Sequence, residues 1–334
     1  MNPASDPPRS AHGTRRPPED WTLRQPFGKR TIFAFFVASL LMAVSAHHAQ
    51  IPGIFTSPTL GKGLARFGSQ AIPIAIAEVT PLSRRPDLDR NHLPLLSHIE
   101  RRETKTSRFD FTENKMVETT EVEEVLVEPV GYLVYVCGKL LESLELAFWG
   151  TFFALVFGLP LACLGAKGYT PNRATYVLSR VASSSFRAIP ELVSALVLTL
   201  GYGFGPRAGV VALAFHSAGF FGKFFADDIE NADRAPQDAL IAAGANRLKV
   251  LCRAVLPQVL PQYIAYTQYI LERNVRMATV IGVVGAGGIG IELKGRFDMY
   301  DFGHVSTIIL VIFLTVLLLE QFSQRLRSRV IAAP

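Results

Sequence analysis

Residues 146–166 read LAFWGTFFALVFGLPLACLGA and contain no ionised side chain. A run of about 20 apolar residues is long enough to cross a bilayer as a helix. The whole chain agrees with this, because 49% of its 334 residues are hydrophobic, 19% are charged and the mean hydropathy is +0.26. Such a composition excludes a disordered chain. Three cysteines without a CxxC pair indicate neither a disulfide scaffold nor a metal site.

Five further apolar runs predict additional spans. The run 31–49 follows a basic segment and has features of a signal-peptide core, but its length favours an uncleaved first span. The remaining runs are 187–205, 207–226, 262–285 and 303–322. Charges interrupt or flank the first three of these, and we keep them because ionised groups are tolerated inside a helix bundle. The sequence therefore predicts an all-α membrane protein with six transmembrane helices.

The distribution of Lys and Arg predicts the orientation. Short cytoplasmic loops carry an excess of basic residues. With six spans, the basic segments 1–30, 167–186, 227–261 and 323–334 all fall on one side. We therefore expect a disordered basic tail at 1–30 and a second basic tail at 323–334, both on the cytoplasmic side of a bacterial inner membrane. The net charge of +6 then reflects cytoplasmic loops rather than binding to nucleic acid.

The segment 50–141 falls on the outer side in this topology. Between residues 81 and 129 it is dense in charges of both signs, and residues 122–136 alternate enough to predict a strand or two. A solvated, partly disordered extracytoplasmic insert is the favoured interpretation. A docking surface for an outside partner is the alternative.

Residues 227–261 read DDIENADRAPQDALIAAGANRLKVLCRAVLPQVLP and connect two predicted spans. Pro236 suits the first turn of a helix, residues 239–243 are strong helix formers, and Gly244 has the place of a C′ glycine. A second helix, at about 247–255, is expected next. A pair of DNA-binding helices would belong to a compact soluble domain, so a helix pair at the membrane surface is favoured over DNA binding and over a plain connector.

This segment resembles the EAA loop of ABC-importer permeases, in which EAA, three residues, Gly, nine residues and I-x-L-P follow one another. Asp238-Ala239-Leu240 takes the EAA place, Gly244 the glycine, and Ala254-Val255-Leu256-Pro257 the end. Three residues differ from the family pattern, since Asp238 replaces Glu, Leu240 replaces the second Ala and Ala254 replaces Ile. The carboxylate at the first position is kept. In the family this helix inserts into the ATPase and transmits its motion. The resemblance assigns ATPase coupling to Asp238, Ala239, Leu240, Ala243, Gly244, Ala245, Asn246, Leu256 and Pro257.

A glycine run, VIGVVGAGGIG at 280–290, contains the G-x-G-x-x-G spacing of dinucleotide sites. Such a site needs a strand before the glycines and a βαβ unit around them, whereas here a new apolar run begins at 303. Glycines that permit a tight turn or close helix packing are the favoured interpretation. This hinge or packing role is predicted for Gly282, Gly285, Gly287, Gly288 and Gly290.

The stretch 274–290 and fragments such as Gly244-Ala245-Asn246-Arg247-Leu248 resemble the phosphonate-importer permeases. The resemblance covers residues 140–330, and within them a permease domain at 142–322, but not the insert near 80–130. It implies a type I ABC importer permease with the MetI-like fold. Its implied partners are membrane lipid, a second copy of the chain in a homodimer, ABC ATPase subunits and an extracytoplasmic phosphonate-binding protein.

The chain itself has no Walker A pattern. We therefore expect no enzyme activity and no cofactor in this chain, with ATP and Mg bound by the partner ATPase. Rival interpretations are an importer of another solute, such as phosphite or methionine, a membrane-bound NAD-dependent oxidoreductase, and a membrane scaffold without transport.

Charged residues inside the predicted spans are candidates for the translocation path. An arginine presents a fork of donors that matches phosphonate oxygens. Glu272 and Arg276 are four residues apart, as are Arg187 and Glu191, so each couple can pair on one helix face. Path lining and purely structural ion pairs both stay open, and His216 is either a packed histidine or a ligand. The path candidates are Arg187, Glu191, His216, Glu272, Arg273, Arg276 and Thr279.

Overall fold

The computed structural model describes residues 28–49, 51, 53, 58–72, 74–85, 96–110 and 115–331. The chain divides into two compact units, Met1–Ala65 and Arg66–Pro334. The first unit contains helix α1, Lys29–His48, whose described side chains are nearly all exposed. Helix α1 confirms a helix at the first predicted span. Most of the predicted N-terminal tail lies outside the described residues.

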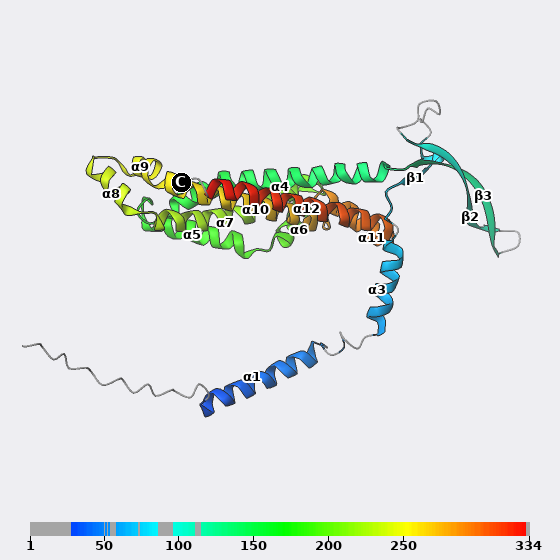
Figure 1. Cartoon of the computed structure of the whole chain (residues 1–334), viewed down its shortest axis with the longest axis horizontal. Coiled ribbons are helices and arrows are strands. Elements are labelled where there is room, and N and C mark those ends of the chain that lie inside the picture. The colour runs from blue at the N-terminus through cyan, green and yellow to red at the C-terminus, as the bar shows by residue number, and fades with distance from the viewer. Residues whose placement is uncertain are drawn as a thin grey trace, which may run out of the picture. The chain divides into compact units, whose positions relative to one another are not determined.

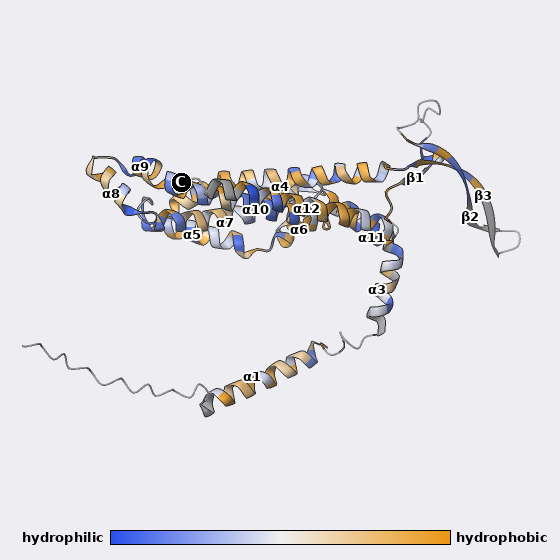
Figure 2. Cartoon of the chain, in the orientation of Figure 1, coloured by the Kyte–Doolittle hydropathy of each residue, from blue (hydrophilic) through white to orange (hydrophobic). Residues whose placement is uncertain are grey.

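Long helices form the bundle of the second unit, and Figure 1 shows them running along one another. They are α4 (Gly131–Leu164), α7 (Pro206–Asn231), α10 (Leu256–Gly282) and α12 (Phe302–Ile331). Figure 2 shows that α4 and α12 are predominantly hydrophobic. Helix α7 is the central element, because it packs against both α4 and α10. The predicted C-terminal tail is helical up to Ile331, since α12 continues to that residue.

A broken helix packs against α7. Its two parts, α5 (Arg173–Ala188) and α6 (Glu191–Tyr202), meet at an angle of 89°. The sequence predicted a loop at 167–186 and one straight span at 187–205, and both boundaries were wrong. Asn172 starts α5 early by accepting a hydrogen bond from the Thr175 amide at 2.8 Å. Pro190 then interrupts the helix, because it has no N–H and forces Ile189 into an extended conformation.

Within the described residues, four helices are long and apolar enough to cross a membrane, or five if the bent pair counts as one span. The four are Thr31–His48, Gly131–Leu164, Pro206–Asn231 and Phe302–Leu326. Helix α10 has 27 residues, a sufficient length, but it carries Glu272, Arg273 and Arg276. The count of six spans fits this architecture and stays a prediction.

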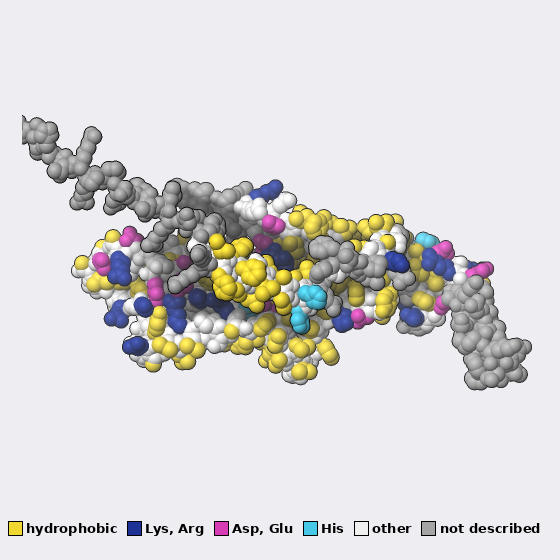
Figure 3. Space-filling view, turned by 90° about the horizontal axis from the view of Figure 1, so that it is seen from below, with side chains coloured by type: hydrophobic (Ala, Val, Ile, Leu, Met, Phe, Trp, Pro, Cys, Tyr) yellow, Lys and Arg dark blue, Asp and Glu magenta, His cyan; other side chains and the backbone are white. Residues whose placement is uncertain are grey.

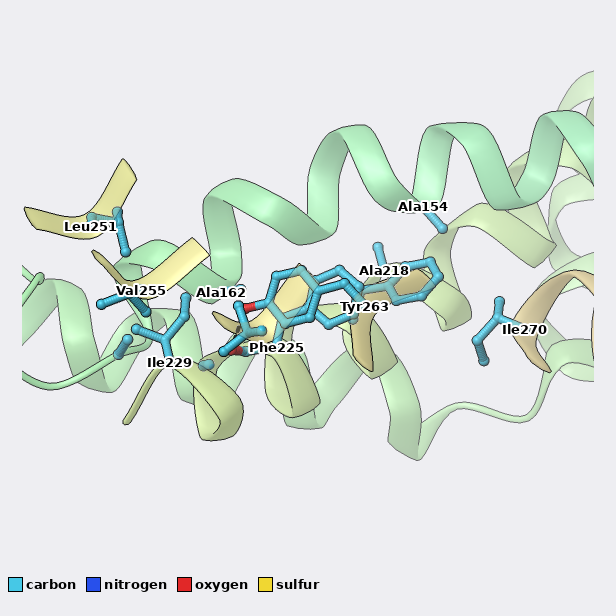
Figure 4. Packing of buried hydrophobic residues seen from close by; sticks show 13 residues of the cluster. Ala154, Ala162, Ala218, Phe225, Ile229, Leu251, Val255, Tyr263 and Ile270 are labelled. Atoms are coloured by element: carbon cyan, nitrogen blue, oxygen red, sulfur yellow. Dashed lines mark hydrogen bonds between the residues drawn. The ribbon is translucent and has the colours of Figure 1, made fainter. Parts of the chain in front are cut away.

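Small residues allow α4 and α7 to approach closely. A Cβ added at Gly150 would lie 2.8 Å from the Leu213 Cβ, and one added at Gly158 would lie 2.6 Å from the Phe221 Cβ. Small residues at contacts are the usual way in which membrane helices gain packing energy. Figure 4 shows the core that results, where the rings of Phe225 and Tyr263 stack with centroids 3.7 Å apart.

A fully buried polar group ties α4, α7 and α10 together. The Asn274 amide nitrogen donates to the Thr151 hydroxyl at 2.9 Å, and the Ser217 hydroxyl donates to the Asn274 carbonyl oxygen at 3.1 Å. All three side chains are at most 4% exposed. Because a buried polar atom without a partner is costly, this network favours one register of the three helices.

The segment before the bundle adds a small antiparallel sheet to the mostly helical fold. Its strands are β1 (Glu78–Pro81), β2 (His98–Asp110) and β3 (Lys115–Glu128), in the order β1-β3-β2. Opposite charges face each other in the register, as in Arg101 with Glu124, whose side chains meet at 3.2 Å. A strand is confirmed up to Glu128, but helix α4 starts at Gly131, so the expected alternation does not continue to 136 as a strand.

The connector between α7 and α10 consists of short helices at one end of the bundle (Figure 1). They are α8 (Arg234–Ala242), α9 (Arg247–Val250) and the π-helical turn η2 (Leu251–Val255), which runs into α10. The helix pair expected for 227–261 is therefore present. Helix α11 (Ile289–Asp298) lies at the other end of the bundle, before α12.

We predict that Asn274→Ala lowers the free energy of unfolding by about 1–2 kcal/mol, because Thr151 and Ser217 lose a buried partner. Thermal denaturation of the purified protein in detergent measures this effect. Thr315→Val is the matched control, since it removes only a hydroxyl that bonds back to Val311 on the same helix. Equal stability of the two variants would contradict a role of the network in holding the helices together.

Candidate functional site

Helix α8 is built as an exposed, firmly capped helix. The Asp233 carboxylate caps its start by accepting from the Ala235 amide at 3.1 Å. At its end Gly244 has φ +83°, and the amides of Gly244 and Ala245 donate to Ile241 and Leu240 at 2.9 Å each. This is a Schellman motif, which a residue without Cβ enters without strain. The predicted role of Gly244 as the C′ residue is confirmed.

The helix pair is joined to the bundle by side chains on its inner side. Tyr169, in the connector after α4, donates to the Gln237 side chain at 2.8 Å, and the Asp233 amide donates to Gln258 of α10 at 3.0 Å. A cavity of about 760 Å³ lies next to α8, and Asp238 contributes to its lining. Motion of α8 would therefore reach the connector between α4 and α5 and the start of α10.

The helix pair also exposes apolar groups, one of which, Ile241, contributes to the lining of the same cavity. No residue of α8 is buried, and Ile241 and Leu248 are 59% and 69% exposed. Exposed apolar side chains beside charged ones are typical of a surface that contacts another protein. Asn246 caps α9 by accepting from the Lys249 amide at 2.9 Å, and Pro257 stands at the first turn of α10. The nine residues predicted for coupling thus belong to one connected structure, in which Ala239, Leu240 and Ala243 lie on α8 or its cap and Leu256 begins α10.

A second cluster lies inside the bundle, at the break between α5 and α6. Arg273 of α10 forms an ion pair with Glu191, and the same guanidinium approaches the His216 Nε2 at 3.1 Å. His216 Nδ1 lies 3.2 Å from the carbonyl oxygen of Ile189, and its Nε2 lies 3.2 Å from the Glu191 carboxylate. We call Glu191, His216 and Arg273 the clamp. It joins α6, α7 and α10 at the point where the helix is interrupted.

The structure contradicts the predicted pairing of Arg187 with Glu191. Arg187 and Glu191 do not share a helix face, because α5 ends at Ala188 and α6 starts at Glu191. The guanidinium of Arg187 lies over the Phe224 ring instead, 5.3 Å from its centroid. The pairing of Arg276 with Glu272 is confirmed, at 2.6 Å on α10. The Glu272–Arg276 pair lies within α10, whereas the clamp joins three helices. His216 is half-buried and hydrogen-bonded, and a role of these residues in the path stays a prediction.

The glycine run forms the turn between α10 and α11. Gly285, Gly287 and Gly288 have φ between +74° and +94°, and the Gly205 amide donates to the Gly285 carbonyl at 2.9 Å. A Cβ at Gly290 would lie 2.2 Å from the carbonyl oxygen of Thr279, and one at Gly282 would lie 2.6 Å from that of Gly287. The turn and packing roles are confirmed. A helix and not a strand precedes the glycines, so the dinucleotide interpretation is wrong.

A family model described as the inner membrane component of binding-protein-dependent transport systems matches residues 154–331, more than half of the chain. The chain belongs to this family. It is therefore a membrane component of a transport system. The match covers the clamp, the α8–α9 pair and the glycine turn. The last two are the parts whose sequence resembles ABC-importer permeases.

Relatives and solved structures agree with the family. The chain is 53% identical to the putative phosphite transport system permease protein HtxE of Stutzerimonas stutzeri over 78% of this chain and 99% of that protein. It is 43% identical to the phosphite transport system permease protein PtxC of the same organism, over 57% of this chain and 69% of that protein. An inward-facing structure of the MetNI methionine ABC transporter covers 60% of this chain and 96% of its own, with a TM-score of 0.52 and 23% identity. The MetI-like fold is thereby confirmed.

Sequence reasoning missed a network at the start of α4. The Glu292 carboxylate of α11 accepts from Tyr132 at 3.3 Å and from Arg296 at 2.8 Å, and the Arg296 guanidinium lies 4.8 Å from the centre of the Tyr132 ring. The spacing of Glu292 and Arg296, four residues apart, was the one available signal. The tyrosine is 160 residues away in sequence, and only the fold brings it there.

This network continues to the first residues of α12. Asp301 accepts from Arg296 at 3.1 Å and lies 2.7 Å from His304 Nδ1, while His304 Nε2 lies 3.2 Å from the carbonyl of Ala77 before strand β1. Partial burial raises the pKa of the Asp301 carboxyl, but His304 and Arg296 outweigh this and hold the pKa below its ordinary value. The network thus fixes α11 and the base of the sheet to the permease bundle.

A further missed cluster lies at the α8–α9 end of the permease. Arg180 of α5 forms ion pairs with Asp227 and Glu230 of α7, and Glu230 also accepts from the Lys167 amide at 2.8 Å. Among the described residues, no group of three His, Cys, Asp or Glu side chains is placed to hold a metal ion.

We predict that Glu191→Leu destabilises the permease by about 3 kcal/mol, because Arg273 is left as an unpaired charge inside the bundle. The double variant Glu191→Leu/Arg273→Leu should recover at least half of this loss, since replacing a whole buried ion pair is often close to neutral. Thermal denaturation in detergent measures both. A double variant less stable than the single one would show that the clamp is not an ion pair in energetic terms.

We also predict that acid weakens the Asp301 network. The pKa of Asp301 is lower in the folded state than in the unfolded chain. Its contribution is therefore fully present above the unfolded carboxyl pKa of about 4 and is lost as the pH falls through the lower, folded value. Asp301→Asn should flatten this part of the pH dependence of the melting temperature. An unchanged acid limb in Asp301→Asn would contradict the assignment.

Proposed function

We propose that this chain is the permease subunit of an ATP-driven importer of phosphorus oxyanions, the class that includes phosphonates and phosphite. The observation that carries the proposal is the cluster of basic side chains inside the bundle at the broken helix. Transport of a small anion through lipid requires a polar, cationic route. Ionised residues in a span are costly, and their gathering at one level of the bundle is expected for a path.

The relatives support the substrate class. Proteins named as phosphite transport permeases are 53% and 43% identical to this chain, and a cryptic phosphonate transport permease, PhnE2 of Escherichia coli, is 40% identical over 36% of the chain. Relatives named as methionine permeases are more distant, at 27% identity or less. Import of methionine is therefore the weaker candidate.

Energy for this transport would come from a separate ATPase that holds ATP and Mg. The exposed face of α8 and α9, with Ile241 and Leu248, supplies the surface on which that ATPase would dock. ATP binding would draw the ATPase subunits together and move α8. The bonds from Gln237 to Tyr169 and from Asp233 to Gln258 would pass this motion to the bundle.

The remaining partners follow from the same proposal. An extracytoplasmic binding protein would deliver the anion, and a second copy of the chain would complete the path at a homodimer interface. Exposed apolar side chains on and after α6, such as Leu200 at 84% and Phe204 at 87%, support a protein or lipid contact there. The basic inner segments favour both termini in the cytoplasm.

Reconstitution in liposomes tests this function. The complex of this chain, its ATPase and its binding protein should hydrolyse ATP faster when the binding protein is loaded with a phosphonate or phosphite. We expect Gly244→Val to lower the stimulated rate by about ten-fold, because a β-branched residue at positive φ disrupts the end of α8.

Gly203→Val is the matched control. Gly203 has φ +84° and open space around its Cβ position, as Gly244 has, so the substitution imposes a similar backbone strain away from the helix pair, at the end of α6. It should retain most of the stimulated rate. Stimulation by methionine alone would favour the weaker candidate, and failure of any ATPase to associate would overturn the proposal.

A further inference from the structure

The charges inside the bundle do not balance. Arg273 is paired with Glu191, Arg276 with Glu272, and Arg180 with Asp227 and Glu230. Two cations of the same region, Arg187 of α5 and Lys223 of α7, have no ion pair or hydrogen bond to any residue that the structure describes. Asp228 of α7 likewise has no ion pair to a described residue, so in this region the two unpaired cations outnumber the unpaired carboxylate.

Arg187 and Lys223 are neighbours across the seam of α5 and α7. The Arg187 Cγ lies 3.0 Å from the position of a Cβ added at Gly219, and its guanidinium lies over Phe224. Lys223 stands one helical turn after Gly219, which places it on the face of α7 that Arg187 packs against. Gly219 makes this approach possible, because a Cβ there would meet the Ser183 carbonyl oxygen at 2.7 Å.

A buried hydroxyl lies at the same level. Ser183, one turn before Arg187, is 1% exposed, and its Oγ has no hydrogen-bond partner among the described residues. It faces α7 at Gly222, where an added Cβ would lie 2.5 Å from this Oγ. Gly222 directly precedes Lys223, so this hydroxyl without a partner lies on the α5–α7 seam at the level of the two cations.

The acidic residues nearest in sequence to Lys223 have other partners or another direction. Asp227 is occupied by Arg180. Asp228 lies five residues beyond Lys223, which is a different side of α7, and it is close enough to Tyr263 of α10 to act on that phenol electrostatically. Two adjacent cations without a counter-ion repel each other, and in a membrane protein this arrangement is retained where an anion binds.

We infer that Arg187, Lys223 and Ser183 form a binding station for a tetrahedral phosphorus oxyanion within the permease. This inference rests on the proposed function and assigns its anion selectivity to particular groups. The station lies between the clamp and the end of the bundle that carries α8 and α9. The planar fork of Arg187 and the point charge of Lys223 match the several oxygens and the charge of a phosphonate.

Lys223 and Arg187 are each only partly buried, so water can compete for the anion. A station of this kind binds its cargo weakly enough to release it, as a translocation path requires. The clamp arginine and Arg276, which the sequence singled out for the path, are neutralised by their own carboxylates. They maintain the shape of the route, and the station supplies its charge.

The test uses the reconstituted complex with saturating loaded binding protein and methylphosphonate as cargo. We expect Lys223→Gln to slow import by about ten-fold, the factor for losing one hydrogen bond to a charged group. Basal ATP hydrolysis and the yield of assembled complex should stay within about two-fold of the wild type. Lys223→Arg should restore more than half of the import rate, because it returns the charge.

Lys294→Gln is the matched control, since Lys294 is an exposed lysine of α11 that pairs with Asp298. It should import at the wild-type rate. Lys223→Met, which is uncharged and of similar length, replaces the first variant if that one does not assemble. If an assembled Lys223→Gln or Lys223→Met variant imports the anion at the normal rate, these residues do not form an anion-binding station. The proposed function would still stand. Absence of oxyanion import in the wild type would overturn the proposed function itself.

Discussion

The arrangement of this permease depends on the interruption between α5 and α6. Pro190 cannot continue the helix, so the chain turns by 89° and the carbonyl of Ile189 loses its helical partner. His216 of α7 binds that carbonyl, and Glu191, the first residue of α6, pairs with Arg273 of α10. An unpaired carbonyl or charge inside a membrane is costly. The break is therefore stable only when α6, α7 and α10 occupy these positions together.

The close packing of the other helices also gives buried polar and charged groups their partners. Glycines at positions 150, 158, 219 and 222 let α7 approach α4 on one side and α5 on the other. At that distance the buried hydrogen bonds of Asn274 and the ion pairs of Arg180 can form. Most charges inside the described bundle find a partner in this way. Arg187 and Lys223 are two cations that do not, and in our proposal they receive the anion.

Local signals were sufficient where a single turn or a single helix decides the conformation. The Schellman motif at Gly244, the turn at Gly285 and the pair Glu272–Arg276 were predicted, because each depends on residues a few positions apart. The pair Arg187–Glu191 was predicted by the same rule and was wrong, since the rule assumes a continuous helix and Pro190 lies between the two. Helix α5 was missed because its many polar residues lower the hydropathy of that stretch.

The sequence by itself determined the class of the protein, its apolar runs, the helix pair between two of them and the resemblance to importer permeases. These features are encoded in composition and in short spacings. The tertiary structure alone decided which charges are neutral pairs and which are free. Glu191 and Arg273 are 82 residues apart, and Tyr132 and Glu292 are 160 residues apart. Distance in sequence carries no information about such contacts, because they depend on how the helices pack.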